Sequence, residues 1–252
     1  MELQAQNLSF AYGKKTVIRN CSVSFSPGSL TVITGPNGCG KSTLIHLLGG
    51  LLEPLTGCVT ADGVPLKDFS HLQRAGFLGV LMQERMPALD FSVRERVLMG
   101  RFSALPRVTA PDEKELMRVE KALEQVGMAS FAATPCNQLS GGEYQKVLVA
   151  ALLVRETPVM LLDEPTSALD PAGALAVMRL LQKKKKECAI TVVTHDLALG
   201  AAFADKLLLV NQGEIFAGGP PAEVLTAENI AAVYHCGAEI LSSGTGVVPV
   251  FK

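Results

Sequence analysis

A glycine-rich segment near the start of the chain combines residue types that bind phosphate. GPNGCGKST, at 35–43, fits the pattern G-x-x-x-x-G-K-[ST] and lies between a β-branched apolar run and a run with helical spacing. Glycines let successive backbone N–H groups point at an anion, and the next helix N-terminus adds partial positive charge. Lys41 can reach the β- and γ-phosphates of a nucleotide, while Ser42 can ligate Mg²⁺. The predicted phosphate-binding residues are Gly35, Pro36, Asn37, Gly38, Cys39, Gly40, Lys41, Ser42 and Thr43.

Polar side chains also follow three other apolar runs. Asp163 and Glu164 end VMLLDE, His195 follows AITVVT, and Gln83 follows AGFLGVLM. If these runs are parallel strands of one sheet, their carboxyl ends face the same crevice as the glycine loop. Asp163 would then hold Mg²⁺, and Glu164 would polarise the attacking water as general base. His195 could donate to the γ-phosphate and Gln83 could contact Mg²⁺ or water, although a lone histidine or amide is also common as a cap.

A second glycine turn has a weaker local signal. In LSGGEYQKVLVAALLV, at 139–154, a serine and two glycines precede an apolar run with the length of a buried helix. By local rules alone, this segment is a structural turn in front of that helix. Beside the first loop, it raises the question of why one chain would carry two such turns.

The remaining pattern predicts the elements that hold these residues. LQAQNLSF and TVIRNCSVSF, separated by a turn at 12–14, predict an antiparallel hairpin. LTVIT, at 30–34, predicts a buried strand, and leucines 44, 47, 48 and 51 predict the helix after the glycine loop. From residue 159 onward strands alternate with helices, which are expected over 171–186 and 196–204. This alternation indicates an α/β fold whose parallel sheet is covered on both faces.

The middle of the chain interrupts this alternation. A strand is expected over 75–82, followed by helices over 92–99, 111–126 and 141–154. The whole chain is therefore expected to be one unit, 1–252, with three parts. These are a core with an antiparallel β part (1–83 and 155–220), a helical subdomain (84–154) and a short C-terminal extension with one or two small helices (221–252).

Composition narrows the functional classes. The 252 residues are 48% hydrophobic with a mean hydropathy of +0.29, yet the apolar runs stay far shorter than the roughly 20 residues of a membrane span. The N-terminus lacks a signal-peptide pattern, so a cytosolic protein is expected. A net charge of −1 gives no positive field for nucleic acid. The six cysteines are scattered without a C-x-x-C pair, which favours isolated thiols.

Together these motifs resemble one family, the nucleotide-binding subunits of ATP-binding cassette (ABC) transporters. GPNGCGKST resembles their Walker A motif, VMLLDE their Walker B motif and LSGGEYQ their signature sequence. Gln83 matches the Q-loop, Asp170 ends the D-loop SALD, and His195 matches the H-loop. Tyr12 matches the aromatic residue that stacks on adenine. The agreement extends over residues 1 to about 220, so it covers nearly the whole chain.

The resemblance implies a P-loop NTPase cassette with a RecA-like parallel-sheet core, an N-terminal antiparallel β subdomain and an inserted α-helical subdomain. It implies ATPase activity with ATP and Mg²⁺, and a head-to-tail homodimer. In such a dimer Ser140, Gly141 and Gly142 would grip the γ-phosphate of ATP bound to the other copy. Glu143 stands where many members have Gln, and Lys146 stands where Arg is usual.

The resemblance also implies partners. Two transmembrane permease subunits are expected to bind the helical subdomain and the Gln83 loop, with a substrate-binding protein acting indirectly and no nucleic acid involved. The chain is expected at the cytoplasmic face of the inner membrane, as a peripheral protein that is soluble when isolated.

Because Cys39 lies in the phosphate loop, a bulky thiol reagent is expected to block ATPase activity, and bound ATP is expected to protect the thiol from the reagent.

The transported molecule is suggested by framework residues. Cys39, SVRERVLMGR at 92–101 and the tail GGPPAEVLTAENIAAVYHC look most like the subfamily that imports metal chelates: ferric siderophores, haem and cobalamin. Importers of zinc or manganese, and a few for oxyanions, share part of this pattern. A soluble cassette ATPase acting on ribosomes or DNA is a further alternative, but such relatives usually carry two cassettes or a long coiled-coil insertion. A regulatory subunit without turnover is disfavoured because Glu164 and His195 are both present.

Overall fold

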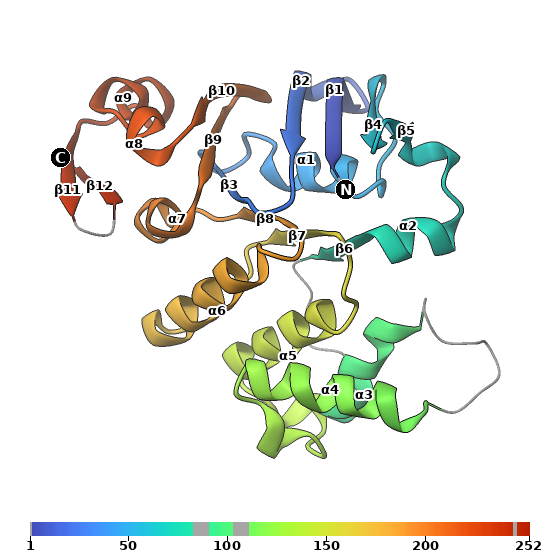
Figure 1. Cartoon of the computed structure of the whole chain (residues 1–252). Helices are drawn as coiled ribbons and strands as arrows, with labels where there is room; N and C mark the ends of the chain where they lie inside the picture. The colour runs from blue at the N-terminus through green and yellow to red at the C-terminus, as the bar shows by residue number, and fades with distance from the viewer. Residues whose placement is uncertain (1, 83–90, 103–110, 244–245) are drawn as a thin grey trace.

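A parallel sheet forms the centre of the fold (Figure 1). The computed structural model describes residues 2–82, 91–102, 111–243 and 246–252, and within them this sheet has six strands. Five strands run parallel, and β10 pairs antiparallel with β9 at one edge. The carboxyl ends of the parallel strands therefore meet along one side. In sheet order the strands are β10 (Glu214–Gly219), β9 (Lys206–Asn211), β3 (Leu30–Thr34), β8 (Ala189–Val193), β7 (Val159–Asp163) and β6 (Leu78–Leu81).

Both faces of this sheet are covered, which confirms the α/β prediction. In β7, Val159 and Leu161 belong to the core that includes α1 (Lys41–Leu48). Met160 and Leu162 belong to the opposite core, with α5 (Gly141–Leu153) and α6 (Pro171–Lys184). These four side chains are fully buried, and each contributes about 1.5–3 kcal/mol of hydrophobic stabilisation. Two apolar layers thus fix the strand whose end carries the predicted acidic pair.

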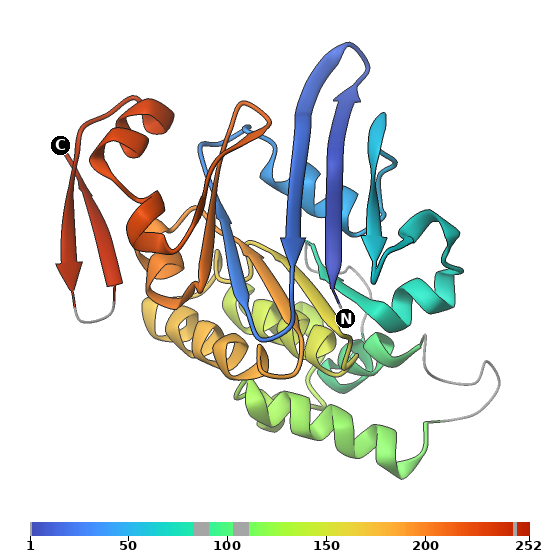
Figure 2. The same ribbon diagram turned by 45° about the horizontal axis from the view of Figure 1, so that its top comes forward.

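A smaller antiparallel sheet packs on the α1 side of the central sheet (Figure 2). The predicted N-terminal hairpin is confirmed, with Leu3 opposite Phe25 and Tyr12 opposite Lys15. Leu3, Phe25 and the helix α1 share one buried core, so the hairpin is held beside the start of α1. In sheet order the strands are β2 (Lys15–Phe25), β1 (Leu3–Tyr12), β4 (Thr56–Ala61) and β5 (Val64–Pro65).

Three helices lie together below the central sheet in Figure 1: α3 (Val93–Leu98), α4 (Glu113–Gln125) and α5. The helices predicted over 92–99, 111–126 and 141–154 are therefore confirmed, with slightly shorter bounds. A buried ion pair joins α4 to the short 3₁₀ helix η2 (Met99–Arg101) that directly follows α3, because the Arg101 guanidinium donates to both carboxylate oxygens of Glu115 at 2.6 and 3.1 Å. Arg101 also donates to the carbonyl of Val154 at 3.2 Å. This cluster ties α3 and α4 to the end of α5, just before β7.

Two elements differ from their prediction. The strand expected over 75–82 begins only at Leu78, because the helix α2 (His71–Phe77) occupies the preceding residues. Ser70 and Gln73 form a reciprocal capping box that starts this helix. The helix after the glycine loop ends at Leu48, where Gly49 caps it, so the side chain of Leu51 lies outside the helix and is 56% exposed.

The C-terminal extension contains α8 (Pro221–Val224), α9 (Ala227–Tyr234) and a hairpin of β11 (Ala238–Ser243) and β12 (Gly246–Phe251). The small helices were expected, but the hairpin was not. The extension packs on α7 (Leu197–Phe203), the helix predicted over 196–204, which follows directly after His195. The Tyr234 hydroxyl shares a hydrogen bond of 3.4 Å with the hydroxyl of Thr34, the last residue of β3.

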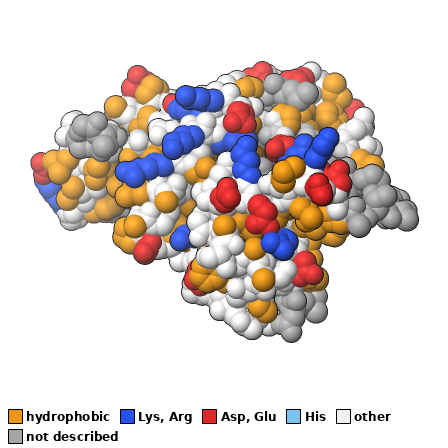
Figure 3. Space-filling view, turned by 60° about the horizontal axis from the view of Figure 1, so that its bottom comes forward, with side chains coloured by type: hydrophobic (Ala, Val, Ile, Leu, Met, Phe, Trp, Pro, Cys, Tyr) orange, Lys and Arg blue, Asp and Glu red, His pale blue; other side chains and the backbone are white. Residues whose placement is uncertain are grey.

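The molecular surface carries charges of both signs. Figure 3 shows Lys and Arg side chains interspersed with Asp and Glu over the face that it presents. Several surface cations are paired, as in the contact of 2.6 Å between Lys185 and Asp205. Among the residues that the structure describes, none of the helices has the length and apolar character needed to cross a membrane.

Candidate functional site

The glycine loop between β3 and α1 has a backbone that only glycine allows at two positions. Gly35 has φ of 150°, and a Cβ there would lie 2.1 Å from the carbonyl oxygen of Val210. Gly40 has φ of 109°, and a Cβ there would lie 2.9 Å from the carbonyl oxygen of Val17. Because both contacts are with backbone atoms, neither can yield easily. The two ends of the loop are thus fixed against neighbouring strands.

The first turn of α1 is left open for a ligand. Helices α4, α5, α6 and α9 each begin with a side chain that accepts a hydrogen bond from a first-turn amide. The N-cap of α1 is Gly40, which provides no such bond. The first amides of a helix have no intrahelical acceptor, and they carry the positive end of the helix dipole. This arrangement fits a phosphate group.

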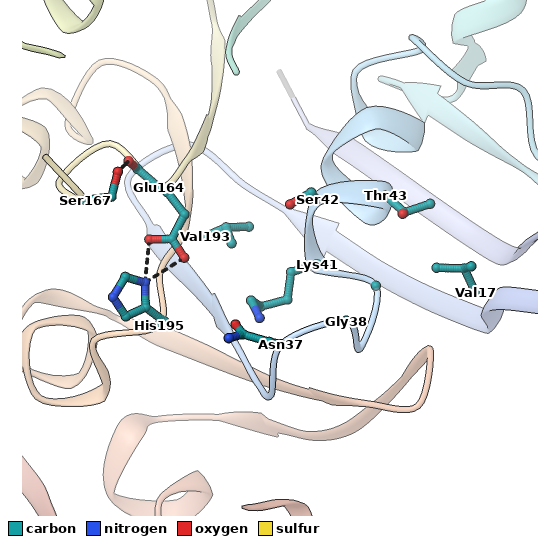
Figure 4. A pocket seen from close by; sticks show the side chains of 11 residues that line it. Val17, Asn37, Gly38, Lys41, Ser42, Thr43, Glu164, Ser167, Val193 and His195 are labelled. Atoms are coloured by element: carbon teal, nitrogen blue, oxygen red, sulfur yellow. Dashed lines mark hydrogen bonds and ion pairs between the residues drawn. The ribbon is translucent and has the colours of Figure 1, made fainter. Parts of the chain in front are cut away.

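Lys41, the first residue of α1, points back across its own loop. Its ammonium group donates to the carbonyls of Gly35 at 2.8 Å and Pro36 at 3.0 Å, and the residue is only 8% exposed. The cation is therefore enclosed by the curve of the loop. Figure 4 shows the end of the Lys41 side chain beside Asn37, across the pocket from the pair formed by Glu164 and His195.

Glu164 and His195 come together just beyond the ends of the neighbouring strands β7 and β8. The His195 Nδ1 atom lies 3.0 Å from each carboxylate oxygen of Glu164 (Figure 4). Since an ionised carboxylate only accepts hydrogen bonds, Nδ1 carries the proton of this contact and Nε2 is left to face other groups. The arrangement can orient a carboxylate beside a phosphate-binding loop.

The backbone of Glu164 is unusual. Its φ is 51°, in the left-handed region, which costs free energy for a residue with a side chain. Its N–H donates to the Val193 carbonyl at 3.0 Å, and its carbonyl accepts from the Ser167 hydroxyl at 3.1 Å. These bonds hold the strained turn that aims the side chain toward the pocket.

Asp163, the last residue of β7, has a buried oxygen without a hydrogen-bond partner in the described part of the chain. The residue is 5% exposed, and the atom concerned is Oδ1. A buried carboxylate oxygen is costly unless another group compensates it. Carboxylate and hydroxyl oxygens are typical Mg²⁺ ligands, and the Ser42 hydroxyl lines the pocket. The residues present therefore fit a magnesium ion.

A pocket of about 390 Å³ brings most of these residues together. Of the predicted residues, it gathers loop residues from both sides of Lys41 with Glu164 and His195. Two lining residues were missed, Val17 from the hairpin and Val193 from β8, and Ser167 belongs to the predicted D-loop but was not assigned to the site. Ser167 could have been found from its place three residues after Glu164, whereas Val17 has no local signal. The complete lining is Val17, Asn37, Gly38, Gly40, Lys41, Ser42, Thr43, Glu164, Ser167, Val193 and His195.

Other predicted site residues do not line this pocket. Tyr12 lies at the tip of the hairpin, 51% exposed, with its ring 4.9 Å from that of Phe10. The Asp170 carboxylate caps α6 by accepting from the Gly173 amide at 2.7 Å. Ser140 caps α5, and Gly141 and Gly142 form its first turn, away from the lining of the chain's own pocket. Gln83 lies outside the described residues.

The side chain of Cys39 turns into the core rather than toward the pocket. It is 7% exposed and packs in the same cluster as Ile33 and Leu44. Burial raises the pKa of this thiol, and the nearby Lys41 opposes that effect only in part. The expected block of ATPase activity by a thiol reagent therefore has to be revised.

We expect Cys39 to be alkylated at least about tenfold more slowly than the half-buried Cys58 and Cys236, because the thiolate is the reacting form. Cys188, whose pKa burial raises to about 11, serves as the slow internal control. Mass spectrometry of peptides after timed alkylation, with and without ATP, measures these rates. Fast labelling of Cys39 that ATP suppresses would contradict the buried position.

Phosphate-loop nucleoside triphosphatases combine a glycine loop that binds phosphate with polar side chains at the ends of neighbouring parallel strands. The loop, the Glu164–His195 pair and the sheet described above are typical of this class. Within that class the family can be stated. The model of the ABC transporter family matches residues 18–167, and the chain belongs to this family. It is an ATP-binding ATPase subunit.

Relatives match nearly the whole chain. The ferric enterobactin transport ATP-binding protein FepC of Escherichia coli is 35% identical over 98% of this chain and 92% of its own length. The hemin import ATP-binding protein HmuV of Bordetella avium is 37% identical over 96% of this chain and 95% of its own. A chain from an inward-facing metal-chelate type ABC transporter superposes with a TM-score of 0.84, at 28% identity over 99% of this chain and 98% of that chain.

A dimeric solved structure is also similar. The ATP-binding cassette MJ0796, in a post-hydrolysis state bound to ADP and Pi, has a TM-score of 0.77 at 26% identity, covering 87% of this chain and 98% of that chain. ATPase domains of this family act as dimers in transporter complexes.

Proposed function

We propose that this chain hydrolyses ATP to energise import of a metal chelate: a ferric siderophore, haem or cobalamin. The observation that carries hydrolysis is the Glu164–His195 pair facing Lys41 in one pocket. The class of cargo is supported by relatives that are named for ferric enterobactin and hemin transport and match almost the full chain. The cargo itself would bind elsewhere, on the membrane subunits and a substrate-binding protein.

The residues at the pocket have distinct proposed roles in hydrolysis. Lys41 and the amides that begin α1 bind the β- and γ-phosphates, and Asp163 and Ser42 hold Mg²⁺, which neutralises phosphate charge when bound. Glu164 accepts the proton of the attacking water. His195 holds that carboxylate through Nδ1 and faces the γ-phosphate through Nε2, where it donates only when the ring is protonated.

A second copy of the chain completes each site in this proposal. Ser140 and Gly141 are exposed at the start of α5, Gly142 beside them is half-buried, and all three lie outside the lining of the chain's own pocket. They grip the γ-phosphate of ATP bound by the other copy in a head-to-tail dimer. Tyr12 stacks on adenine, Asp170 lies near the shared site, and Gln83 contacts Mg²⁺ or the water.

We assign the three parts of the chain different tasks. Residues 1–83 and 155–220 bind ATP, 84–154 form the helical subdomain, and 221–252 form the extension. Between β6 and the helices lies a cavity of about 200 Å³, lined by Leu81, Met82 and Leu148 and bordered by Arg96 and Arg155. This cavity would receive a cytoplasmic loop of one of two permease subunits, which places the chain at the cytoplasmic face of the inner membrane.

Uptake measurements test the proposal. Deleting the gene is expected to lower uptake of one radiolabelled chelate (ferric siderophore, haem or cobalamin) at least about tenfold while leaving free zinc, manganese and oxyanion uptake unchanged. The wild-type gene should restore uptake and Glu164→Gln should not. A protein that sediments with ribosomes or nucleoid when its membrane partners are present, and a deletion with normal chelate uptake, would each overturn it.

A further inference from the structure

In the described part of the chain, three helices begin with the same capping box, a serine followed three residues later by Gln or Glu. The pairs are Ser70 with Gln73 at α2, Ser92 with Glu95 at α3, and Ser140 with Glu143 at α5. In each pair the serine oxygen accepts from the third-position amide at 3.3 Å, and the serine amide donates to the third side chain at 2.8 Å. The backbone arrangement is therefore the same at all three helices.

The serine hydroxyl behaves differently in the two kinds of box. With glutamate, it also donates to the carboxylate: the distance is 2.6 Å from Ser140 to Glu143 and 2.7 Å from Ser92 to Glu95. With glutamine, no such bond from the Ser70 hydroxyl is found among the described residues. Hydrogen bonds to an ionised group are about twice as strong as neutral ones. In the glutamate boxes the serine hydroxyl therefore uses its one proton in a hydrogen bond to a negatively charged carboxylate.

This difference matters only at α5. Under the proposed function, on which this inference rests, Ser140 must offer its hydroxyl proton to the γ-phosphate of ATP on a second copy. Phosphate oxygens are acceptors, so Ser140 can donate to them only by leaving Glu143. The Glu143 carboxylate also places a negative charge beside a polyanion, and Lys146, one turn further along α5, offsets it in part.

We propose that Glu143 competes with the triphosphate for the Ser140 hydroxyl, and so limits the stability of the ATP-closed dimer. Glutamate at this position makes the closed state easier to leave, which favours repeated opening after hydrolysis. The role is one of positioning and charge, since Glu143 acts through Ser140.

The test compares matched variants in a Glu164→Gln background, in which hydrolysis is slow and ATP-bound dimers accumulate. Glu143→Gln is expected to lower the ATP concentration for half-maximal dimer formation about tenfold, as measured by analytical ultracentrifugation with Mg²⁺ and ATP. Glu95→Gln makes the same change in an equivalent box on α3 and is expected to cause no shift. Because the interaction is electrostatic, the difference in half-maximal ATP concentration between Glu143→Gln and its parent should become smaller as the salt concentration is raised.

Several results overturn the proposal. It fails if Glu143→Gln dimerises at the same or a higher ATP concentration than its parent, if Glu95→Gln shifts equally, or if salt does not change the difference. Binding of a fluorescent ATP analogue to dilute monomers should be equal in all variants, because each copy's own loop is untouched. If the Glu164→Gln parent itself never dimerises with ATP, the head-to-tail dimer is refuted and this inference with it. A dimer that forms without the Glu143 effect refutes the inference alone.

Discussion

Replacing Glu164 with Gln is expected to slow ATP hydrolysis by about 10²–10⁴-fold while leaving ATP binding intact, because the amide cannot accept the proton of the attacking water. The amide has nearly the same shape, so the strained turn and its bonds to Val193 and Ser167 should persist. With hydrolysis stalled, the closed dimer should accumulate. Steady-state phosphate release and gel filtration with Mg²⁺ and ATP measure the two effects.

The chain contains a matched control for this substitution. Glu156 precedes β7 as Glu164 follows it, and it also has a left-handed backbone, with φ of 54°. Its carboxylate pairs with Arg118 on the surface, far from the chemistry proposed for the other end of the strand. Glu156→Gln should therefore retain normal turnover. A Glu164→Gln protein that remains monomeric and keeps full turnover would contradict the assignment of the base.

Replacing Ser140 with Arg is expected to reduce hydrolysis at least about a hundredfold without weakening each chain's own ATP binding. The large side chain would occupy the space against the other copy's γ-phosphate, while the loop around Lys41 lies elsewhere. The substitution also removes a helix cap, which costs about 1 kcal/mol of stability. Ser92→Arg removes the equivalent cap of α3 and should destabilise the protein similarly but keep activity.

Mixing two inactive variants tests whether each ATP site is built from residues of both copies. Lys41→Ala disables a chain's own phosphate loop, whereas Ser140→Arg disables the loop of its partner. In a mixed dimer of the two, one site combines an intact Lys41 with an intact Ser140. An equal mixture is therefore expected to recover up to about a quarter of wild-type activity, because half of the dimers are mixed and each has one complete site. No recovery, with mixed dimers shown to form, would contradict the shared site.

Much of the fold follows from local patterns. Continuous apolar strands such as VMLLD require cover on both faces, and both cores of the structure contain alternate residues of that strand. The predicted start of the strand at Ala75 was wrong. A capping box of Ser70 and Gln73 begins a helix there, and the apolar residues that end this helix were read as part of the strand. The C-terminal hairpin was missed because its stability comes from packing on α7, which no local pattern of residues 238–251 reveals.

The candidate site was predictable where strand ends converge. Glu164 and His195 could be placed at one crevice because the ends of parallel strands meet, and both side chains line the pocket. Asp163 is the last residue of β7 but is not among the residues that line the pocket. Val17 was missed because its place in the pocket depends on how the hairpin docks beside Gly40. The burial of Cys39 depends on the direction of one side chain in a loop, which sequence spacing does not determine.

The C-terminal extension contacts two elements that lead into the candidate site: the end of β3, through the Tyr234–Thr34 hydrogen bond, and α7, on which it packs. Thermodynamic linkage is reciprocal, so any ordering of this extension that favours ATP binding must itself be favoured by ATP to the same degree. Such coupling would change how often α9 and the β11–β12 hairpin unfold locally, which amide hydrogen exchange measures. The exchange rates of their backbone amides would therefore act as a built-in reporter of nucleotide occupancy, at a place where no nucleotide binds.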